Sequence, residues 1–143
     1  MSRRTTIYIP DHARPVIGPL GSDDSLSGRI TTILQRYQEI LDRSRPQFAE
    51  AEWLAIIDAN LAHWFGDDPS ELRLIWLNVA DAEGLGKKWG IDQAALANKL
   101  RQLPYAAQVA VTEIIERYHG SGGASHRDRL EAAGIKCHYR NEK

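Results

Sequence analysis

The chain has 143 residues, of which 43% are hydrophobic and 26% are charged, enough for one domain or for a small module joined to a larger one. No apolar run approaches the roughly 20 residues that a membrane-spanning helix needs, and no apolar stretch follows the basic N-terminus as in a secretory signal. Cys137 is the only cysteine, which excludes an internal disulfide and favours a reducing, cytoplasmic location.

The net charge of −1 hides an uneven distribution of charged residues. Residues 1–45 contain seven basic and five acidic side chains, residues 46–119 contain six and eleven, and residues 120–143 contain five and three. An acidic middle argues against a protein that coats nucleic acid along its whole length. It permits a basic end that contacts DNA.

The first predicted element is a strand at Arg3–Ile9. Its side chains alternate between two faces as in a half-exposed strand, and Pro10 ends it. Residues 11–20 contain Pro15 and Pro19, which allow only a short or irregular helix there.

A long amphipathic helix is predicted next, capped by Ser25 or Ser27 and ending near Ser44, before Pro46. Its apolar residues recur with helical spacing: Leu26, Ile30, Ile33, Leu34, Tyr37, Ile40 and Leu41. These features set residues 1–45 apart as one unit.

Residues 46–120 are predicted to form a helical domain. We expect helices at about 47–65, after the start signal Asp68-Pro69-Ser70-Glu71, after the cap Asp92, and at about 105–118. The helix that follows Asp68 is apolar nearly all round and should be the buried centre. Residues 121–143 are predicted to be a flexible joint and a tail, with a short helix at about 125–133.

A single strand in a helical chain needs a pairing partner, because its backbone groups are otherwise unsatisfied. That partner is either the C-terminal tail or the same strand of a second chain. The order of basic residues, strand, acidic helix start, glycine turn and Ser-Leu-Ser helix start resembles the ribbon-helix-helix repressors of the Arc and MetJ type. The resemblance covers about 40 residues, approximately 3–42.

In that family two chains pair their strands into a ribbon that enters the DNA major groove. The resemblance implies base contacts by Arg4, Thr6 and Tyr8, and phosphate contacts by Arg3, Ser25, Ser27 and Gly28. It implies a dimer core formed by Ile7, Ile9, Leu26, Ile30, Ile33, Leu34 and Tyr37. The chain departs from the family where Pro15, Gly18 and Pro19 interrupt the first helix. The alternative is a strand and a helix that merely pack on the C-terminal body.

Other patterns are given packing interpretations. A helix–turn–helix pattern surrounds Trp89-Gly90-Ile91-Asp92, but such geometry is common in helical bundles, and Asp92 with few basic residues is poor for reading a groove. His119, His126, Cys137 and His138 lack the spacing of metal ligands. No nucleophile or base is tied to the paired acidic residues. We therefore expect no enzyme activity, no metal and no cofactor.

The sequence predicts a mainly α protein that binds double-stranded DNA as a homodimer, with no membrane partner. By resemblance it would be a transcriptional repressor or a DNA-transfer accessory factor of a mobile element. The alternative is an adaptor or inhibitor of a host complex, acting through the acidic domain at 46–120. Its tryptophans would then form a protein-binding patch: Trp53, Trp64, Trp76 and Trp89.

Overall fold

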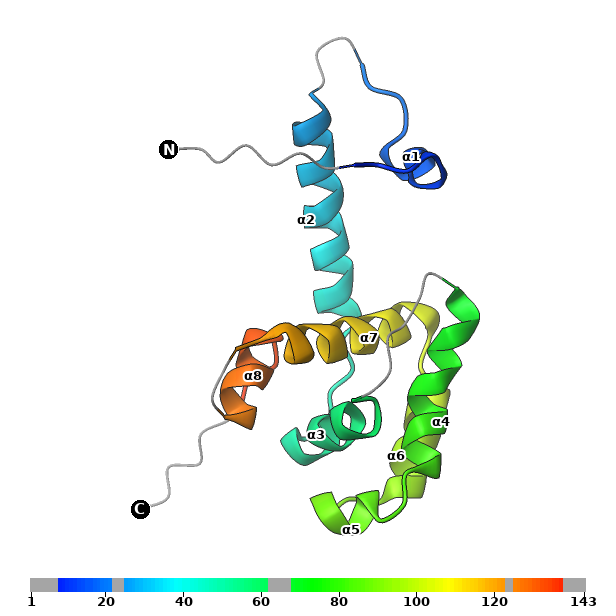
Figure 1. The fold of residues 1–143 in the computed structure, drawn as a ribbon, viewed down its shortest axis with the longest axis vertical. Coiled ribbons are helices and arrows are strands. Elements are labelled where there is room, and N and C mark those ends of the chain that lie inside the picture. Colours follow the sequence, from blue (N-terminus) through cyan, green and yellow to red (C-terminus); the bar gives the residue numbers. More distant parts are fainter. Residues whose placement is uncertain (1–7, 22–24, 62–67, 123–124, 138–143) are drawn as a thin grey trace. The chain divides into compact units, whose positions relative to one another are not determined.

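The computed structural model describes residues 8–21, 25–61, 68–122 and 125–137 (Figure 1). Within these ranges every regular element is helical. The elements in chain order are the 3-10 turn η1 (Asp11–Ala13), α1 (Arg14–Ile17), α2 (Leu26–Ser44), α3 (Glu50–Ala59), the 3-10 turn η2 (Pro69–Arg73), α4 (Leu74–Asp81), α5 (Leu85–Trp89), α6 (Gln93–Arg101), α7 (Tyr105–Gly120) and α8 (His126–Ala132). The prediction of a mainly α protein is confirmed.

The predicted ribbon strand is not seen in the part of the chain that the structure describes. Most of Arg3–Ile9 lies outside the described residues, and its last two residues, Tyr8 and Ile9, adopt no regular secondary structure. The chain divides into two compact units, 1–40 and 41–143. The boundary falls inside α2, five residues before the predicted one at 45.

The N-terminal unit is built around the start of α2. Pro15 lies in the first turn of α1, where its missing N–H costs nothing, and Gly18 ends that helix with a φ of 71°. The irregular stretch 11–20 therefore forms η1 and a single turn of α helix. The guanidinium of Arg29 on α2 donates from Nε to the carbonyl of Ile17, at 2.8 Å, and so ties α2 to the end of α1.

The helix starts predicted from capping residues are confirmed. The side chain of Ser25 accepts a hydrogen bond from the backbone N–H of Gly28 at 3.0 Å, and Asp92 accepts one from Ala95 at the same distance. Asp68 accepts from the N–H of Ser70, although the element that it opens is η2, and α4 begins only at Leu74. A side-chain acceptor relieves one of the unpaired N–H groups at each helix start.

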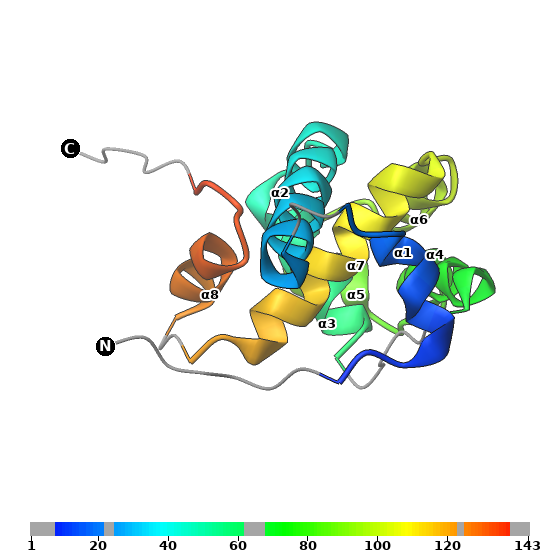
Figure 2. The same cartoon turned by 90° about the horizontal axis from the view of Figure 1, so that it is seen from above.

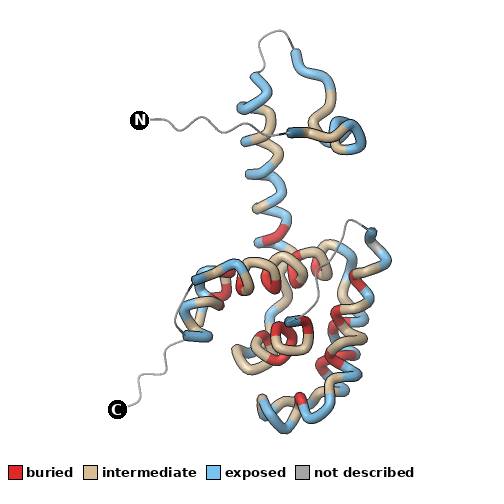
Figure 3. The backbone as a smooth tube through the Cα atoms, in the orientation of Figure 1, coloured by how far each residue is buried: buried red, intermediate tan, exposed pale blue. Residues whose placement is uncertain are grey.

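The C-terminal unit has one closed core. α4 packs along α6, α3 contacts α5, and α7 contacts α8, as the two views of Figures 1 and 2 also show. Buried positions cluster on the facing sides of these helices (Figure 3). The largest fully buried apolar side chains are Trp53, Ile56, Val79, Leu96, Leu100, Val111, Ile115 and Leu130.

The sequence suggested only a break at Gly84-Leu85-Gly86, but in the structure the short helix α5 begins there, at Leu85. It is a short helix with a glycine in the left-handed conformation at each end, Gly84 with φ 72° and Gly90 with φ 66°. Side chains other than glycine rarely adopt this conformation. The two glycines therefore allow the chain to enter and leave the helix abruptly.

The segment 125–137 closes one side of the core. Leu130 and Ala133 are completely buried and Ile135 is 7% exposed, and all three belong to the main cluster. The guanidinium of Arg45 donates to the carbonyl of Gly134 at 2.9 Å. Sequence analysis placed these residues in a loosely attached tail, whereas in the structure they are part of the folded unit.

One polar side chain, Asn60, is fully buried in this unit. Its amide donates to the carbonyl of Ile56 at 2.8 Å, and its side-chain oxygen accepts from the amide of Asn78 at the same distance. The hydrogen bond joins the end of α3 to the middle of α4. Burial of Asn60 without these partners would cost about 1–3 kcal/mol.

Candidate functional site

The residues predicted to read bases are only partly described. The predicted base contacts Arg4 and Thr6 lie outside the described residues, as do the predicted phosphate contact Arg3 and the predicted dimer-core residue Ile7. Tyr8 is described and is 85% exposed. It lines an apolar hollow of about 460 Å³ together with Ile9, Arg14, Ile17, Gly18, Leu20 and Leu26. The fold thus brings one predicted base contact beside two predicted dimer-core residues, Ile9 and Leu26.

Two of the predicted phosphate contacts bind each other. The N–H of Gly28 donates to the Ser25 side chain, so this amide serves the helix cap in the structure. A Cβ at position 28 would lie only 2.8 Å from the Ser25 oxygen, so the glycine leaves room for the cap. Ser27 is exposed, and its carbonyl accepts from the Thr31 hydroxyl at 2.9 Å. The Ser27 side chain is thus exposed beside the cap, whereas the Ser25 oxygen accepts from Gly28.

The predicted dimer-core residues on α2 do not form a core within one chain. Leu26 is 46% exposed, Leu34 is 59% exposed and Tyr37 is 38% exposed, while Ile30 and Ile33 are half-buried. None of the described residues between 8 and 40 is buried (Figure 3). The N-terminal unit therefore presents an apolar helix side that none of its described residues, 8–21 and 25–40, closes.

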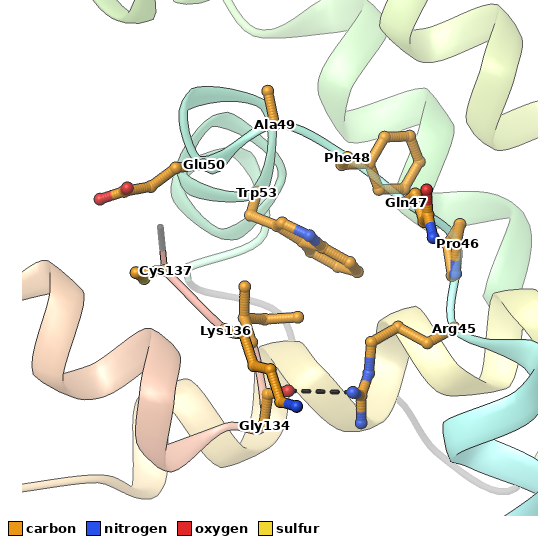
Figure 4. A pocket seen from close by; sticks show the side chains of 11 residues that line it. Arg45, Pro46, Gln47, Phe48, Ala49, Glu50, Trp53, Gly134, Lys136 and Cys137 are labelled. Atoms are coloured by element: carbon orange, nitrogen blue, oxygen red, sulfur yellow. Dashed lines mark hydrogen bonds between the residues drawn. The ribbon is translucent and has the colours of Figure 1, made fainter. Parts of the chain in front are cut away.

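A second hollow, of about 550 Å³, lies in the C-terminal unit between the start of α3 and residues 134–137 (Figure 4). Figure 4 shows Trp53 and Arg45 turned toward that segment. The guanidinium of Arg45 is engaged by the Gly134 carbonyl and, at 2.9 Å, by the carboxylate of Asp42. Both terminal nitrogens of Arg45 thus have partners, as expected of a side chain that fastens the C-terminal segment.

The thiol in this hollow is not an activated nucleophile. Burial raises the pKa of Cys137 above its ordinary value, and the negative charges of Glu50 and Glu131 raise it further, against the opposing effect of Arg127. A thiol needs a lowered pKa to react as a thiolate near neutral pH. The raised pKa therefore favours the neutral thiol form of Cys137.

A polar network joins α3, α5, α7 and α8. The carboxylate of Asp58 accepts from the Lys88 ammonium at 2.8 Å and from the Trp89 indole at 2.9 Å. Burial alone would raise the pKa of Asp58, but these two hydrogen bonds, with the charges of Lys88 and His126, hold it below its ordinary value. The hydroxyl of Tyr118 lies 2.5 Å from Nδ1 of His126. The network binds four helices together at their ends.

The described tryptophans all have packing roles. Trp53 is 2% exposed, Trp76 lies under the Arg101 guanidinium, and Trp89 bonds to Asp58 and meets the His126 ring edge-on. Trp64 lies outside the described residues.

The residues that we weighed as metal ligands do not converge. No three His, Cys, Asp or Glu side chains come together as a metal-ligand group within the described ranges, and His138 lies outside them. Burial and the nearby charge of Arg129 lower the pKa of His119, which favours its neutral form. None of the described helices is both long enough and apolar enough to cross a bilayer.

Sequence analysis missed four exposed basic residues on α5 and α6. Lys87 and Lys88 lie on the first helix and Lys99 and Arg101 on the second. The signal was present in the sequence, but the charges were counted over the whole of 46–119, where acidic residues outnumber them. Counting by predicted element would have found these residues.

Comparison of the chain with protein-family models, with curated proteins and with solved structures finds no match.

Proposed function

We propose that the protein binds double-stranded DNA in a sequence-specific manner, as a homodimer formed through its N-terminal unit. Its role would be that of a transcriptional repressor or a DNA-transfer accessory factor. The observation that carries the proposal is the open apolar side of α2, on which Leu26, Leu34 and Tyr37 are exposed.

A unit of about 40 residues without a buried core does not fold stably by itself, and oligomerisation is the usual remedy. A second copy of α2 offers the same apolar side and can close the core symmetrically. The N-terminal residues then lie next to their counterparts, where two strands can satisfy each other's backbone groups. A two-stranded ribbon of this kind fits the major groove of B-DNA.

The resemblance to ribbon-helix-helix repressors supports the assignment of roles on that ribbon. Arg4, Thr6 and Tyr8 share one parity and would face the bases, while Ile7 and Ile9 would face the dimer core. Tyr8 is strongly exposed, in agreement with a side chain that faces a ligand. The Ser27 hydroxyl, at the start of α2, would contact a phosphate.

The test begins with a selection from random duplex DNA, followed by titration of three variants against the recovered site and a scrambled control. Arg4→Ala removes a guanine contact worth roughly 1–3 kcal/mol of discrimination per chain, so specific binding should fall much more than non-specific binding. Ser27→Ala should weaken binding about evenly across sequences. Ile7→Ala should weaken the dimer and leave base preference unchanged.

Oligomeric state provides an independent check. Light scattering at micromolar concentration should give about twice the chain mass of 16.1 kDa. A monomer that enriches no DNA site would refute the proposal and leave the protein-interaction alternative. Identical phenotypes of Arg4→Ala and Ile7→Ala would show that the two faces of the strand are not divided as proposed.

A further inference from the structure

The C-terminal unit contains a helix–turn–helix whose turn depends on two glycines. α5 ends at Trp89, Gly90 adopts the left-handed conformation, and the N–H of Ile91 donates to the carbonyl of Gly86 at 3.0 Å. A Cβ at position 86 would lie 2.8 Å from the Ile91 carbonyl oxygen, so the turn closes against bare backbone. Two helices joined by a three- or four-residue turn that contains glycine occur in many helical bundles, and the DNA-binding helix–turn–helix is one use of this arrangement.

The second helix of this motif is held firmly from its inner side. Leu96 and Leu100 are buried in the main core. The amide of Gln93 donates to the carbonyls of Val79 and Ala82, at 2.8 and 2.5 Å, while its oxygen accepts from the N–H of Gly86. Gln93 thus fastens the start of α6 to the end of α4 and to α5. A helix fixed in this way presents a rigid outer side.

That outer side has the composition of a groove-facing surface. Its exposed residues are Ala94, Ala95, Asn98, Lys99, Arg101 and Gln102. The exposed Asp92 precedes them, and its carboxylate accepts from the N–H of Ala95 as the helix cap. Alanines near the start of the helix allow close approach and suit the thymine methyl group, and an asparagine amide pairs with an adenine edge. Lysine and arginine further along the helix suit phosphates or guanine.

Charge marks this surface apart from the rest of the unit. The unit 41–143 contains thirteen basic and fifteen acidic residues, of which four basic and one acidic lie in 85–103. That segment therefore has a net charge of +3, while the remainder of the unit has −5. Lys88 is paired with Asp58. Lys87, Lys99 and Arg101 are also exposed, although the Lys99 ammonium donates to the Gln47 carbonyl at 3.5 Å. A polyanion would be repelled by most of the unit and attracted to this surface.

We infer that α5 and α6 form a second contact with double-stranded DNA, in which α6 faces the major groove and α5 lies along the backbone. Lys99 and Arg101 contact phosphates, and Asn98 reads a base. The inference shares its ligand with the proposed function, but it stands on a different unit of the chain. One polypeptide would then contact DNA at two places.

The experiment measures the affinity of the full-length chain for a random 30-base-pair duplex across a range of salt concentrations, by fluorescence anisotropy. Lys99→Gln/Arg101→Gln removes two charges from α6 and retains most of each side-chain stem. The slope of log K against log salt should become shallower by about 2 for each chain bound, since each lost phosphate contact removes about 0.9. The matched control Arg73→Gln/Lys136→Gln removes two exposed charges elsewhere in the same unit and should leave the slope unchanged.

Two further variants complete the experiment: one separates loss of charge from altered packing, and the other tests base reading. Lys99 lies over the Phe48 ring and Arg101 over the Trp76 ring, so the double substitution also alters packing. Lys99→Arg/Arg101→Lys keeps both charges and should restore the wild-type slope; failure to restore it would overturn the inference. Asn98→Ala should change base preference at one position and leave the slope unaltered.

The outcomes for the two DNA contacts are distinguishable. If Arg4→Ala abolishes site preference while the α6 double variant binds like wild type, the proposed function stands and the inference is wrong. If the α6 variant alone weakens binding, the inference stands and the assignment to the N-terminal unit is wrong. Equal losses in the α6 variant and its matched control would also overturn the inference. A wild-type chain that binds no duplex refutes both.

Discussion

The two units of the chain are both helical but differ in how far the apolar side chains of their helices are buried. In the C-terminal unit, Val79, Val111 and Ile115 are completely buried. In the N-terminal unit, none of the described residues is buried, although α2 is the longest helix. Helix formation depends on local caps and periodicity, whereas burial depends on partners. The comparison favours a self-sufficient C-terminal unit and is the basis for the proposal that a second copy completes the N-terminal unit.

Truncation is the strongest test of this comparison. Residues 41–137 contain the whole core and should unfold cooperatively, whereas residues 46–120 lack Leu130, Ala133 and Ile135 and should not. Loss of even one such leucine costs about 2–5 kcal/mol, against a total stability of about 5–15 kcal/mol for a typical domain. Thermal melting followed by circular dichroism checks the prediction. A cooperative melt of 46–120 would show that the C-terminal segment is dispensable.

Two leucines in different units sharpen the contrast. Leu130→Ala removes a fully buried side chain and should lower the free energy of unfolding by about 2–5 kcal/mol. Leu34→Ala changes a side chain that is 59% exposed in the single chain, so it should leave that unfolding transition unchanged. It should instead weaken self-association, measured by analytical ultracentrifugation. Equal effects of both variants on melting would contradict the division into a closed and an open unit.

The smallest expected change in stability concerns the polar network around Asp58 in the C-terminal unit. Asp58→Asn removes the charge that accepts from Lys88 and Trp89, and should destabilise the protein by about 1–3 kcal/mol near neutral pH. Because the folded-state pKa of Asp58 lies below its ordinary 3.8, its stabilisation is complete above that value and is lost as the pH falls through the folded-state pKa.

Urea unfolding at several pH values measures this dependence. The stabilities of wild type and Asp58→Asn should converge in acid. Asp81→Asn, at an exposed position, serves as the control and should change stability little at any pH. A constant difference between wild type and Asp58→Asn down to the lowest pH would show that the ionised carboxylate does not supply the stabilisation.

Sequence reasoning succeeded where structure is decided locally. A short side chain that accepts a hydrogen bond from a free N–H of the following turn marks a helix start. Ser25, Asp68 and Asp92 are of this kind. The end of α2 before Pro46 follows from the same kind of short-range steric rule. Such signals need no knowledge of what the helix packs against.

Sequence analysis failed where the burial of a residue depends on contacts with residues far away in the chain. Leu130 lies in a short segment after a glycine joint, and only the assembled core shows that it is fully buried. The open side of α2 has the same apolar spacing as a buried helix, so periodicity alone does not distinguish the two. In the candidate sites, the mutual bond of Ser25 and Gly28 and the outward face of α6 likewise became visible only in three dimensions.

The hydrogen bond between Asn60 and Asn78 bears on how a unique packing is selected. α4 is apolar nearly all round, so several rotations of this helix about its axis would bury similar amounts of oily surface. Only one rotation brings Asn78 to Asn60; every other would leave the buried side-chain oxygen of Asn60 without this donor. The hydrogen bond thus favours the native rotation of α4 over other rotations, which hydrophobic contacts alone do not distinguish well. Replacing both asparagines by leucine would then leave a compact helical unit with more than one packing.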